Sequence, residues 1–194
     1  VIADILHSVA VNHVITIDLH SAQTQGFFDM TIENITLEKN FADYIEKHYK
    51  KDSFAIASPD AGGVKRARKI ADLVHCNDVI IIDKNRYVKN KSKVMNIIGD
   101  PKDKNIIIID DMIDTAGTIC HAAAALKEKG ANHVSVMATH PVFSGNAYEN
   151  LSKEDIDKII VTNTLTVKPE LTKVDFIDIS EILAENIYQI FSHK

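Results

Sequence analysis

Short, continuously apolar segments that alternate with helix-like segments are the feature of this sequence that most restricts its fold. The clearest are residues 54–58 (FAIAS), 78–83 (DVIIID), 105–110 (NIIIID) and 133–140 (HVSVMATH). Apolar runs without polar alternation are typical of strands buried on both faces, which occur mainly in parallel sheets covered by helices. The sequence therefore predicts an α/β fold with a mostly parallel sheet that is flanked by helices on both faces.

Segments with helical spacing separate these strands, and no repeat, low-complexity tract or Pro/Gly/Ser linker interrupts the alternation. We therefore treat residues 1–194 as a single α/β region. Helices are expected at residues 1–11, 37–49, 61–75, 115–130 and 180–191, and further strands at residues 13–19, 157–163 and 174–179.

Residues 84–100 break the alternation. Apolar periodicity is absent before Val94, and the segment is interpreted as a mobile basic excursion from the sheet. Charge runs are usually solvated faces. Lys84 and Arg86 differ by position, because they follow the end of a predicted strand and would lie near a cleft there. The basic residues of the segment are Lys84, Arg86, Lys89, Lys91 and Lys93.

Composition excludes several classes of protein. The hydrophobic fraction of 45% and the charged fraction of 25% are those of an ordinary soluble globule, and the net charge of −5 argues against nucleic-acid binding. Cys76 and Cys120 have no CxxC spacing, so neither a disulfide framework nor a zinc knuckle is indicated. The sequence holds no apolar run of about 20 residues and no signal-peptide pattern. We expect a cytoplasmic protein without a membrane or nucleic-acid partner.

The end of the strand at residues 105–110 is the strongest candidate site, because ligands of parallel sheets bind at the carboxyl ends of strands. Apolar residues give way there to Asp110 and Asp111, and then to Asp114-Thr-Ala-Gly-Thr at a helix start. Carboxylates can accept hydrogen bonds from vicinal hydroxyls, and free backbone N–H groups can hold a phosphate. The alternative is a solvated loop in which Asp114 only caps the helix. The segment is neither a Walker A loop nor GxGxxG, so a generic nucleotide site is not implied.

His20 and Asp60 follow two other predicted strands and could approach a common divalent ion. Magnesium usually takes few protein ligands and several waters, so two side chains are enough for such a site. On spacing alone, however, a histidine at this position is more often a structural hydrogen-bonding residue.

Six blocks of the sequence together resemble one known family. IIIIDDMIDTAGT (residues 106–118) is similar to the ribose-5-phosphate motif of the phosphoribosyltransferase fold, and DDMIDTAGT resembles the form found in ribose-phosphate pyrophosphokinases. The other blocks follow in that family's order, and the similarity covers essentially all 194 residues. These blocks are DLHSAQTQGFFD, SPDAGGVKRA, DKNR, VMNIIGD and THPVFSGNA.

The resemblance implies a sugar-phosphate site after residue 109. Asp110 and Asp111 would hold the ribose hydroxyls, and the residues that follow would wrap the 5-phosphate. Small residues suit this task because the backbone can approach the ligand. Ala116 stands where family members often carry a second glycine. The phosphate-binding residues implied are Asp114, Thr115, Ala116, Gly117 and Thr118.

The resemblance also implies a metal and catalytic residues. His20 and Asp60 match residues associated with Mg²⁺ and the ATP phosphates, whereas Asp18, Asp29 and Glu33 are further metal candidates. Where this chain has Glu33, the family usually shows aspartate. Lys84 and Arg86 match a catalytic Lys-x-Arg that stabilises charge on the transferred group, and Arg86 is also assigned to ribose 5-phosphate.

The activity that the resemblance implies is transfer of pyrophosphate from MgATP to the 1-hydroxyl of ribose 5-phosphate, giving 5-phosphoribosyl 1-diphosphate (PRPP) and AMP. Such enzymes assemble as dimers and hexamers. The chain starts with Val1 and resembles a carboxyl-terminal portion, so we expect a longer two-domain enzyme. The isolated 194 residues are expected to bind ribose 5-phosphate and could be inactive alone.

Two alternatives remain open. One is a non-catalytic regulatory homologue, although Lys84, Arg86, Asp110 and Asp114 are all present. The other is a phosphoribosyltransferase that consumes PRPP, against which the DLH, SPD and DKNR blocks argue.

Overall fold

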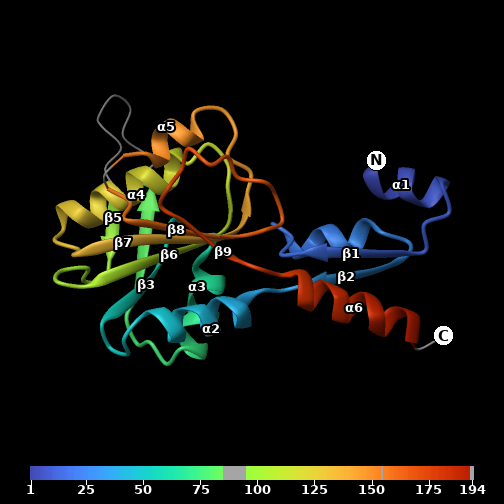
Figure 1. Cartoon of the computed structure of the whole chain (residues 1–194), viewed down its shortest axis with the longest axis horizontal. Helices are drawn as coiled ribbons and strands as arrows, with labels where there is room; N and C mark the ends of the chain where they lie inside the picture. Colours follow the sequence, from blue (N-terminus) through green and yellow to red (C-terminus); the bar gives the residue numbers. More distant parts are fainter. Residues whose placement is uncertain (85–94, 154, 193–194) are drawn as a thin grey trace.

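Strands and helices alternate along the chain in a computed structural model that describes residues 1–84, 95–153 and 155–192 (Figure 1). The helices are α1 (Ile2–Ser8), α2 (Glu38–His48), α3 (Val64–Leu73), α4 (Gly117–Glu128), α5 (Ala147–Leu151), α6 (Ser180–Ser192) and the 3-10 helix η1 (Ala22–Phe27). The strands are β1 (His13–Ile17), β2 (Thr31–Ile35), β3 (Phe54–Ser58), β4 (Val79–Lys84), β5 (Met95–Ile98), β6 (Asn105–Ile113), β7 (His133–Pro141), β8 (Lys158–Thr162) and β9 (Val174–Ile177).

A seven-stranded sheet with the order β5-β4-β3-β6-β7-β8-β9 forms the body of the described structure. Its neighbouring strands are parallel except for β5, which runs antiparallel to β4. β6 lies at the middle of this order, and the run Ile106 to Ile109 is fully buried. The predicted α/β class with a mostly parallel sheet is therefore confirmed.

Helices cover both faces of this sheet, as its apolar strands require. Side chains of a strand alternate between faces, so Ile106 and Ile108 join one core cluster while Ile107 and Ile109 join the other. The first cluster lies under α4 and α5, and the second lies over α2 and α3 (Figure 1). Burial of residues 106–109 between two cores thus fixes the position of Asp110 and Asp111, which come next in the same strand.

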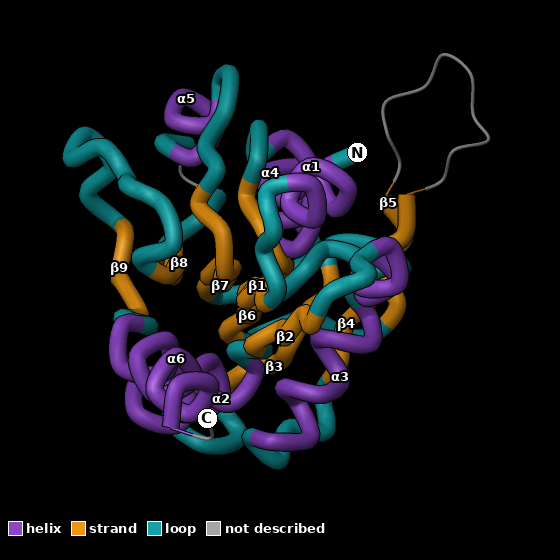
Figure 2. The backbone as a smooth tube through the Cα atoms, turned by 90° about the vertical axis from the view of Figure 1, so that its right-hand side faces the viewer, coloured by secondary structure: helices purple, strands orange, loops and turns teal. Residues whose placement is uncertain are grey.

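β1 and β2 form a separate parallel sheet beside the main one, and α6 lies next to this pair (Figures 1 and 2). The end of β1 is tied to β7, because His140 donates from Nε2 to the carbonyl of Ile17 over 2.9 Å. The opening helix α1 forms as predicted, but its apolar residues Ile2, Ile5 and Val9 are exposed at the far end of the molecule (Figure 1). In the described residues, no helix is both long enough and apolar enough to span a bilayer.

Several elements depart from the expectations. The interpretation of residues 84–100 as an excursion is wrong for Met95–Ile98, which return to the sheet as the edge strand β5. Residues 85–94 lie outside the described part. β2 and η1 were not expected, because a short strand of mixed burial such as Thr31–Ile35 carries no clear periodicity. β6 continues through Asp110 and Asp111 to Ile113, since its pairing with β7 extends to that residue.

Candidate functional site

A pocket of about 240 Å³ lies where the carboxyl ends of β3 and β6 meet the segment after β1. The structure here brings the predicted pair His20 and Asp60 together with the acidic residues that follow Ile109. The lining residues are His20, Asp60, Asp110, Asp111, Met112, Asp114, Thr115, Ala116, Gly117, Thr118 and Ile119.

The loop between β6 and α4 has the geometry of an anion cradle. α4 begins at Gly117, and backbone N–H groups at the start of a helix are suited to bind an anion. Ala116 precedes it with φ 61° and ψ 0°, a left-handed conformation that favours glycine and costs an L-residue about 1–2 kcal/mol. This explains why small residues occupy the loop, and why a glycine would suit position 116.

The segment between β7 and α5, together with α5 itself, supports this loop. The backbone N–H of Phe143 donates to the carbonyl of Ile113 over 2.9 Å, and the Asn150 amide donates from Nδ2 to the carbonyl of Thr115 over 3.0 Å. Ser144 donates from Oγ to Asp114. Asp114 is not the helix cap, because the cap position is Ala116 and α4 has no side-chain cap. The capping alternative is therefore wrong.

Asp110 and Asp111 differ in their environments although they are adjacent. The backbone N–H of Asp111 donates to Asp110 Oδ1 over 2.9 Å. Burial, reinforced by the neighbouring Asp111 carboxylate, raises the pKa of Asp110 to about 7. Burial also acts to raise the pKa of Asp111, but hydrogen bonds from Asp110 and His20 and the charge of Arg66 lower it overall. The pair therefore combines one protonatable carboxyl with one stable carboxylate.

Asp111 connects three segments of the chain. His20 Nδ1 lies 2.8 Å from its Oδ2, and Arg66 Nη1 lies 3.4 Å from its Oδ1. Arg66, on α3, was not predicted as a site residue. The signal that could have found it is its place in the first turn of the helix that follows Ser58 to Asp60, because such helix starts lie at the same edge of the sheet as the strand ends.

Asp60 is held by a tight turn between β3 and α3. Ser58 donates from Oγ to the Asp60 carbonyl over 2.7 Å, and the Gly63 N–H donates to Asp60 Oδ1 over 3.0 Å. A Cβ at position 63 would lie 2.7 Å from Ser58 Oγ, so glycine is required there. This turn places the exposed Asp60 carboxylate on the pocket wall opposite the α4 loop.

The remaining metal candidates lie elsewhere. Asp18 is buried and accepts a 2.5 Å hydrogen bond from Thr139 Oγ1, and burial raises its pKa. Asp29 is exposed after η1, and Glu33 on β2 pairs with His13 at 3.3 Å. None of these three lines the pocket described above.

The predicted catalytic pair falls mostly outside the described structure. Lys84 is the last residue of β4, and only its backbone is described. Arg86 lies outside the described residues. Their roles therefore remain predictions from the sequence.

Across the described ranges, no group of three or more His, Cys, Asp or Glu side chains is arranged to hold a metal ion. A magnesium ion that keeps most of its waters needs only one or two protein ligands. Asp60 offers the oxygen ligand that magnesium prefers, and the ring of His20 lines the same pocket. This donor set fits a hydrated ion that is also bound by substrate phosphates.

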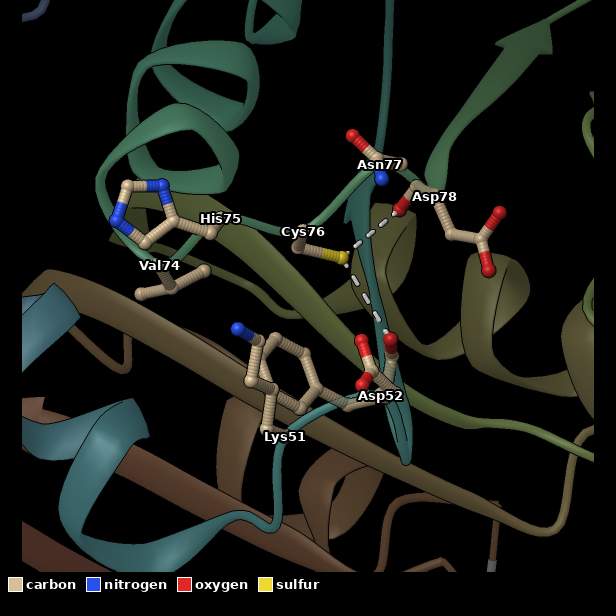
Figure 3. Close-up of a pocket in the computed structure, with 8 residues that line it drawn as sticks. Lys51, Asp52, Val74, His75, Cys76, Asn77 and Asp78 are labelled. Carbon is tan, nitrogen blue, oxygen red and sulfur yellow. Dashed lines mark hydrogen bonds between the residues drawn. The ribbon is translucent and has the colours of Figure 1, made fainter.

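A second pocket, of about 300 Å³, lies at the amino ends of β3 and β4 (Figure 3). The Cys76 thiol lies between the carbonyls of Phe54 and Asp78, 3.6 Å from each. Burial raises the pKa of this thiol, so it is not an activated nucleophile. Because ligands of parallel sheets bind at the opposite edge, the pocket beside β6 is the functional candidate.

The fold and the cradle after β6 together define an α/β protein of the phosphoribosyltransferase type. Residues 52–194, more than half of the chain, match the family described as Phosphoribosyl synthetase-associated domain, and the chain belongs to that family. The predicted family is thereby confirmed.

Curated relatives match along the whole chain. It is 45% identical to the ribose-phosphate pyrophosphokinase of Wolinella succinogenes over 193 residues, and 48% identical to that of Shewanella oneidensis over 202 aligned positions. Each alignment covers 100% of this chain and 62% of the relative. The chain thus spans about three fifths of the length of these relatives.

Solved structures agree with this fold. The phosphoribosylpyrophosphate synthetase of Mycobacterium smegmatis superposes with a TM-score of 0.90 at 34% identity, covering 100% of this chain and 63% of that one. An adenine phosphoribosyltransferase superposes over 64% of this chain and 76% of its own, with a TM-score of 0.51 at 16% identity, which indicates a shared fold alone.

Proposed function

We propose that the protein to which this chain belongs is a ribose-phosphate pyrophosphokinase, which converts ribose 5-phosphate and ATP into PRPP and AMP. The observation that carries this proposal is the pocket at the end of β6, where the half-buried Asp110 and the buried Asp111 adjoin a helix N-terminus that is preceded by a left-handed residue. Carboxylates that accept hydrogen bonds from hydroxyls thus lie next to backbone N–H groups that can donate to a phosphate, and a sugar phosphate needs both. The relatives named ribose-phosphate pyrophosphokinase support the same activity.

The described residues perform the binding part of the reaction. Asp110 receives the ribose hydroxyls, and the backbone N–H groups from Thr115 to Thr118 receive the 5-phosphate. Ribose 5-phosphate held in this way presents its 1-hydroxyl to the β-phosphorus of ATP. The pyrophosphoryl group moves as a unit and AMP leaves, while Lys84 and Arg86 neutralise the charge that builds on it.

Mg²⁺ is the cofactor that this reaction implies, with His20 and Asp60 as the residues that would hold it near the ATP phosphates. When bound, it would neutralise phosphate charge and orient the transferred group. Asp18, Asp29 and Glu33 are less suited, because none of them lines the pocket.

The assembly and location of the enzyme follow the same proposal. We expect a homo-oligomer, a dimer or a hexamer, in the cytoplasm, with ribose 5-phosphate and ATP as its ligands. Light scattering of the purified full-length protein measures the mass of the assembly.

A turnover assay on the full-length protein tests the proposal. Ribose 5-phosphate with MgATP is expected to yield AMP and PRPP, and Lys84→Ala is expected to lower kcat by about 100-fold or more with less than a threefold change in ribose 5-phosphate Kd. Lys129→Ala, an exposed lysine after α4, is the matched control and retains full activity.

The outcomes separate the candidate functions. Sugar binding without AMP formation by the full-length protein would favour the regulatory homologue. PRPP consumption with a free base would favour a phosphoribosyltransferase. Equal loss of turnover and sugar binding in Lys84→Ala would contradict the role given to that lysine.

A further inference from the structure

Both carboxylate oxygens of Asp111 are already engaged by protein groups. Oδ2 lies 2.8 Å from His20 Nδ1, and Oδ1 lies 3.4 Å from Arg66 Nη1. The side chain is only 6% exposed, in contrast to the 77% exposed ring of His20. Asp111 lines the pocket, but protein groups already contact both of its oxygens, so it is less available to a sugar hydroxyl than an unengaged carboxylate would be.

The contact with Asp111 determines which nitrogen of His20 carries the proton. A carboxylate only accepts hydrogen bonds, so a neutral His20 must donate from Nδ1, and its lone pair then lies on Nε2. In the described structure, Nε2 takes part in no hydrogen bond or ion pair with the protein. The ring lines the pocket that also contains Asp60, so an unprotonated Nε2 is available there as an acceptor.

We propose that Asp111 is a positioning residue for His20: it fixes the tautomer with the proton on Nδ1 and presents Nε2 to the pocket. This inference rests on the proposed function, in which His20 acts toward magnesium or the ATP phosphates. A metal-binding histidine usually donates its other N–H to a carboxylate, which fixes the ring and raises its basicity. The contact of His20 with Asp111 has this form.

Arg66 completes the arrangement from the other side. Its side chain is 19% exposed, and it comes from α3, whose preceding turn holds Asp60. Arg66 therefore anchors the Asp111 carboxylate to the segment that carries Asp60. One carboxylate, that of Asp111, therefore joins three segments: the segment after β1, the end of β6 and α3. Asp110 then remains as the residue that accepts hydrogen bonds from the sugar hydroxyls.

The tautomer of His20 is measurable in this chain by NMR. In ¹⁵N-histidine-labelled protein, long-range ¹H–¹⁵N correlations distinguish a protonated ring nitrogen from an unprotonated one, and His20→Gln assigns the signal. The expected result for the native chain is a protonated Nδ1 and an unprotonated Nε2. Asp111→Asn and Asp111→Ala are expected to shift the tautomer ratio toward protonated Nε2 by about fivefold or more. A retained amide spectrum shows that each variant is folded.

Ligand binding supplies a matched comparison between the two adjacent aspartates. We expect Asp110→Asn to weaken ribose 5-phosphate binding by about tenfold or more, and Asp111→Asn to change it by less than about threefold, measured by calorimetry. Conversely, we expect the Mn²⁺ concentration that broadens the His20 NMR signal to a given width to be about tenfold higher in Asp111→Asn than in the native chain.

A protonated Nε2 in the native chain, or an unchanged tautomer in both Asp111 variants, would overturn the inference. Equal loss of sugar affinity in the two asparagine variants would overturn it as well, because Asp111 would then act on the sugar. A native chain that binds no ribose 5-phosphate would refute the proposed function instead, and the tautomer measurement would still test the role of Asp111.

Discussion

At the scale of single residues, the site contains a carboxyl group whose protonation changes near neutral pH. Burial beside Asp111 raises the pKa of Asp110 to about 7, far above the usual value for an aspartate. Between about pH 4 and pH 7, Asp110 therefore keeps its proton in the folded state, whereas the same carboxyl has lost its proton in the unfolded chain. Over this range, the free energy of unfolding that Asp110 contributes falls as pH rises. The destabilisation caused by ionising the buried carboxyl reaches its full value above about pH 7.

Asp110→Asn is expected to remove this cost. Asparagine keeps the shape and the oxygen that accepts the Asp111 N–H, so we expect the free energy of unfolding at pH 8 to increase by about 2 kcal/mol. The gain should be smaller at pH 5 and absent near pH 4. Urea unfolding at pH 5 and pH 8 measures it.

Asp43→Asn on the exposed face of α2 serves as the control and should change stability by less than about 0.5 kcal/mol at either pH. An equal gain in the free energy of unfolding for Asp110→Asn at pH 5 and pH 8 would show that ionisation of Asp110 does not destabilise the folded state.

At the scale of elements, the proposed phosphate-binding loop between β6 and α4 depends on the short helix α5 as well as on α4. Asn150 on α5 holds the Thr115 carbonyl, and Cys120 on α4 donates from Sγ to the Asn150 carbonyl over 3.3 Å. The two helices therefore fix the loop between β6 and α4 from both sides. A loop that carries a left-handed Ala116 needs such support, because its conformation is not the intrinsic preference of its residues.

We expect Asn150→Ala to lower the free energy of unfolding by about 1 kcal/mol, because the Thr115 carbonyl loses its donor. The backbone N–H groups of the loop between β6 and α4 should then be held less rigidly, which should also weaken ribose 5-phosphate binding by about fivefold. Chemical denaturation and calorimetry on this chain measure the two effects.

Asn146→Ala is the matched control, since Asn146 is exposed at the start of the same helix and makes no capping hydrogen bond. Both quantities should stay close to their native values in that variant. Unchanged sugar affinity in Asn150→Ala would mean that the loop keeps its shape without α5.

At the scale of the whole molecule, stability is concentrated in the centre of the seven-stranded sheet. β3, β6 and β7 are buried between two cores, whereas α1 has seven residues and exposes the apolar side chains of Ile2 and Ile5. An isolated helix of this length is marginal in water.

Hydrogen exchange should follow this division. Amides of β6 are expected to exchange at least about 1000-fold more slowly than those of α1, with protection in β6 approaching that of global unfolding. Exchange measured by mass spectrometry or NMR on the native chain gives both rates. Comparable protection of α1 and β6 would show that α1 is held by contacts that its exposure does not reveal.

The sequence by itself determined the class of fold and the position of the loop that we propose binds the sugar phosphate. Apolar runs such as residues 106–109, bounded by polar residues and alternating with helical segments, are typical of buried strands, and acidic residues after them are then expected near a strand end. These are local properties, because burial and strand direction follow from residues that are neighbours in the chain. The family resemblance followed from the same local blocks.

Only the tertiary structure decided how the blocks combine. His20 and Asp111 are 91 positions apart, and the contact between them depends on how the end of β1 is held against the main sheet, through Asp18 and Ile17, by β7. Likewise, the pKa values of Asp110 and Asp111 differ because of burial and because of Arg66. The sequence shows only two adjacent aspartates and cannot reveal this difference. The edge strand β5 was missed because its pairing, rather than its own four residues, makes it a strand. Such contacts join distant parts of the chain, and their energies exist only once the chain has folded.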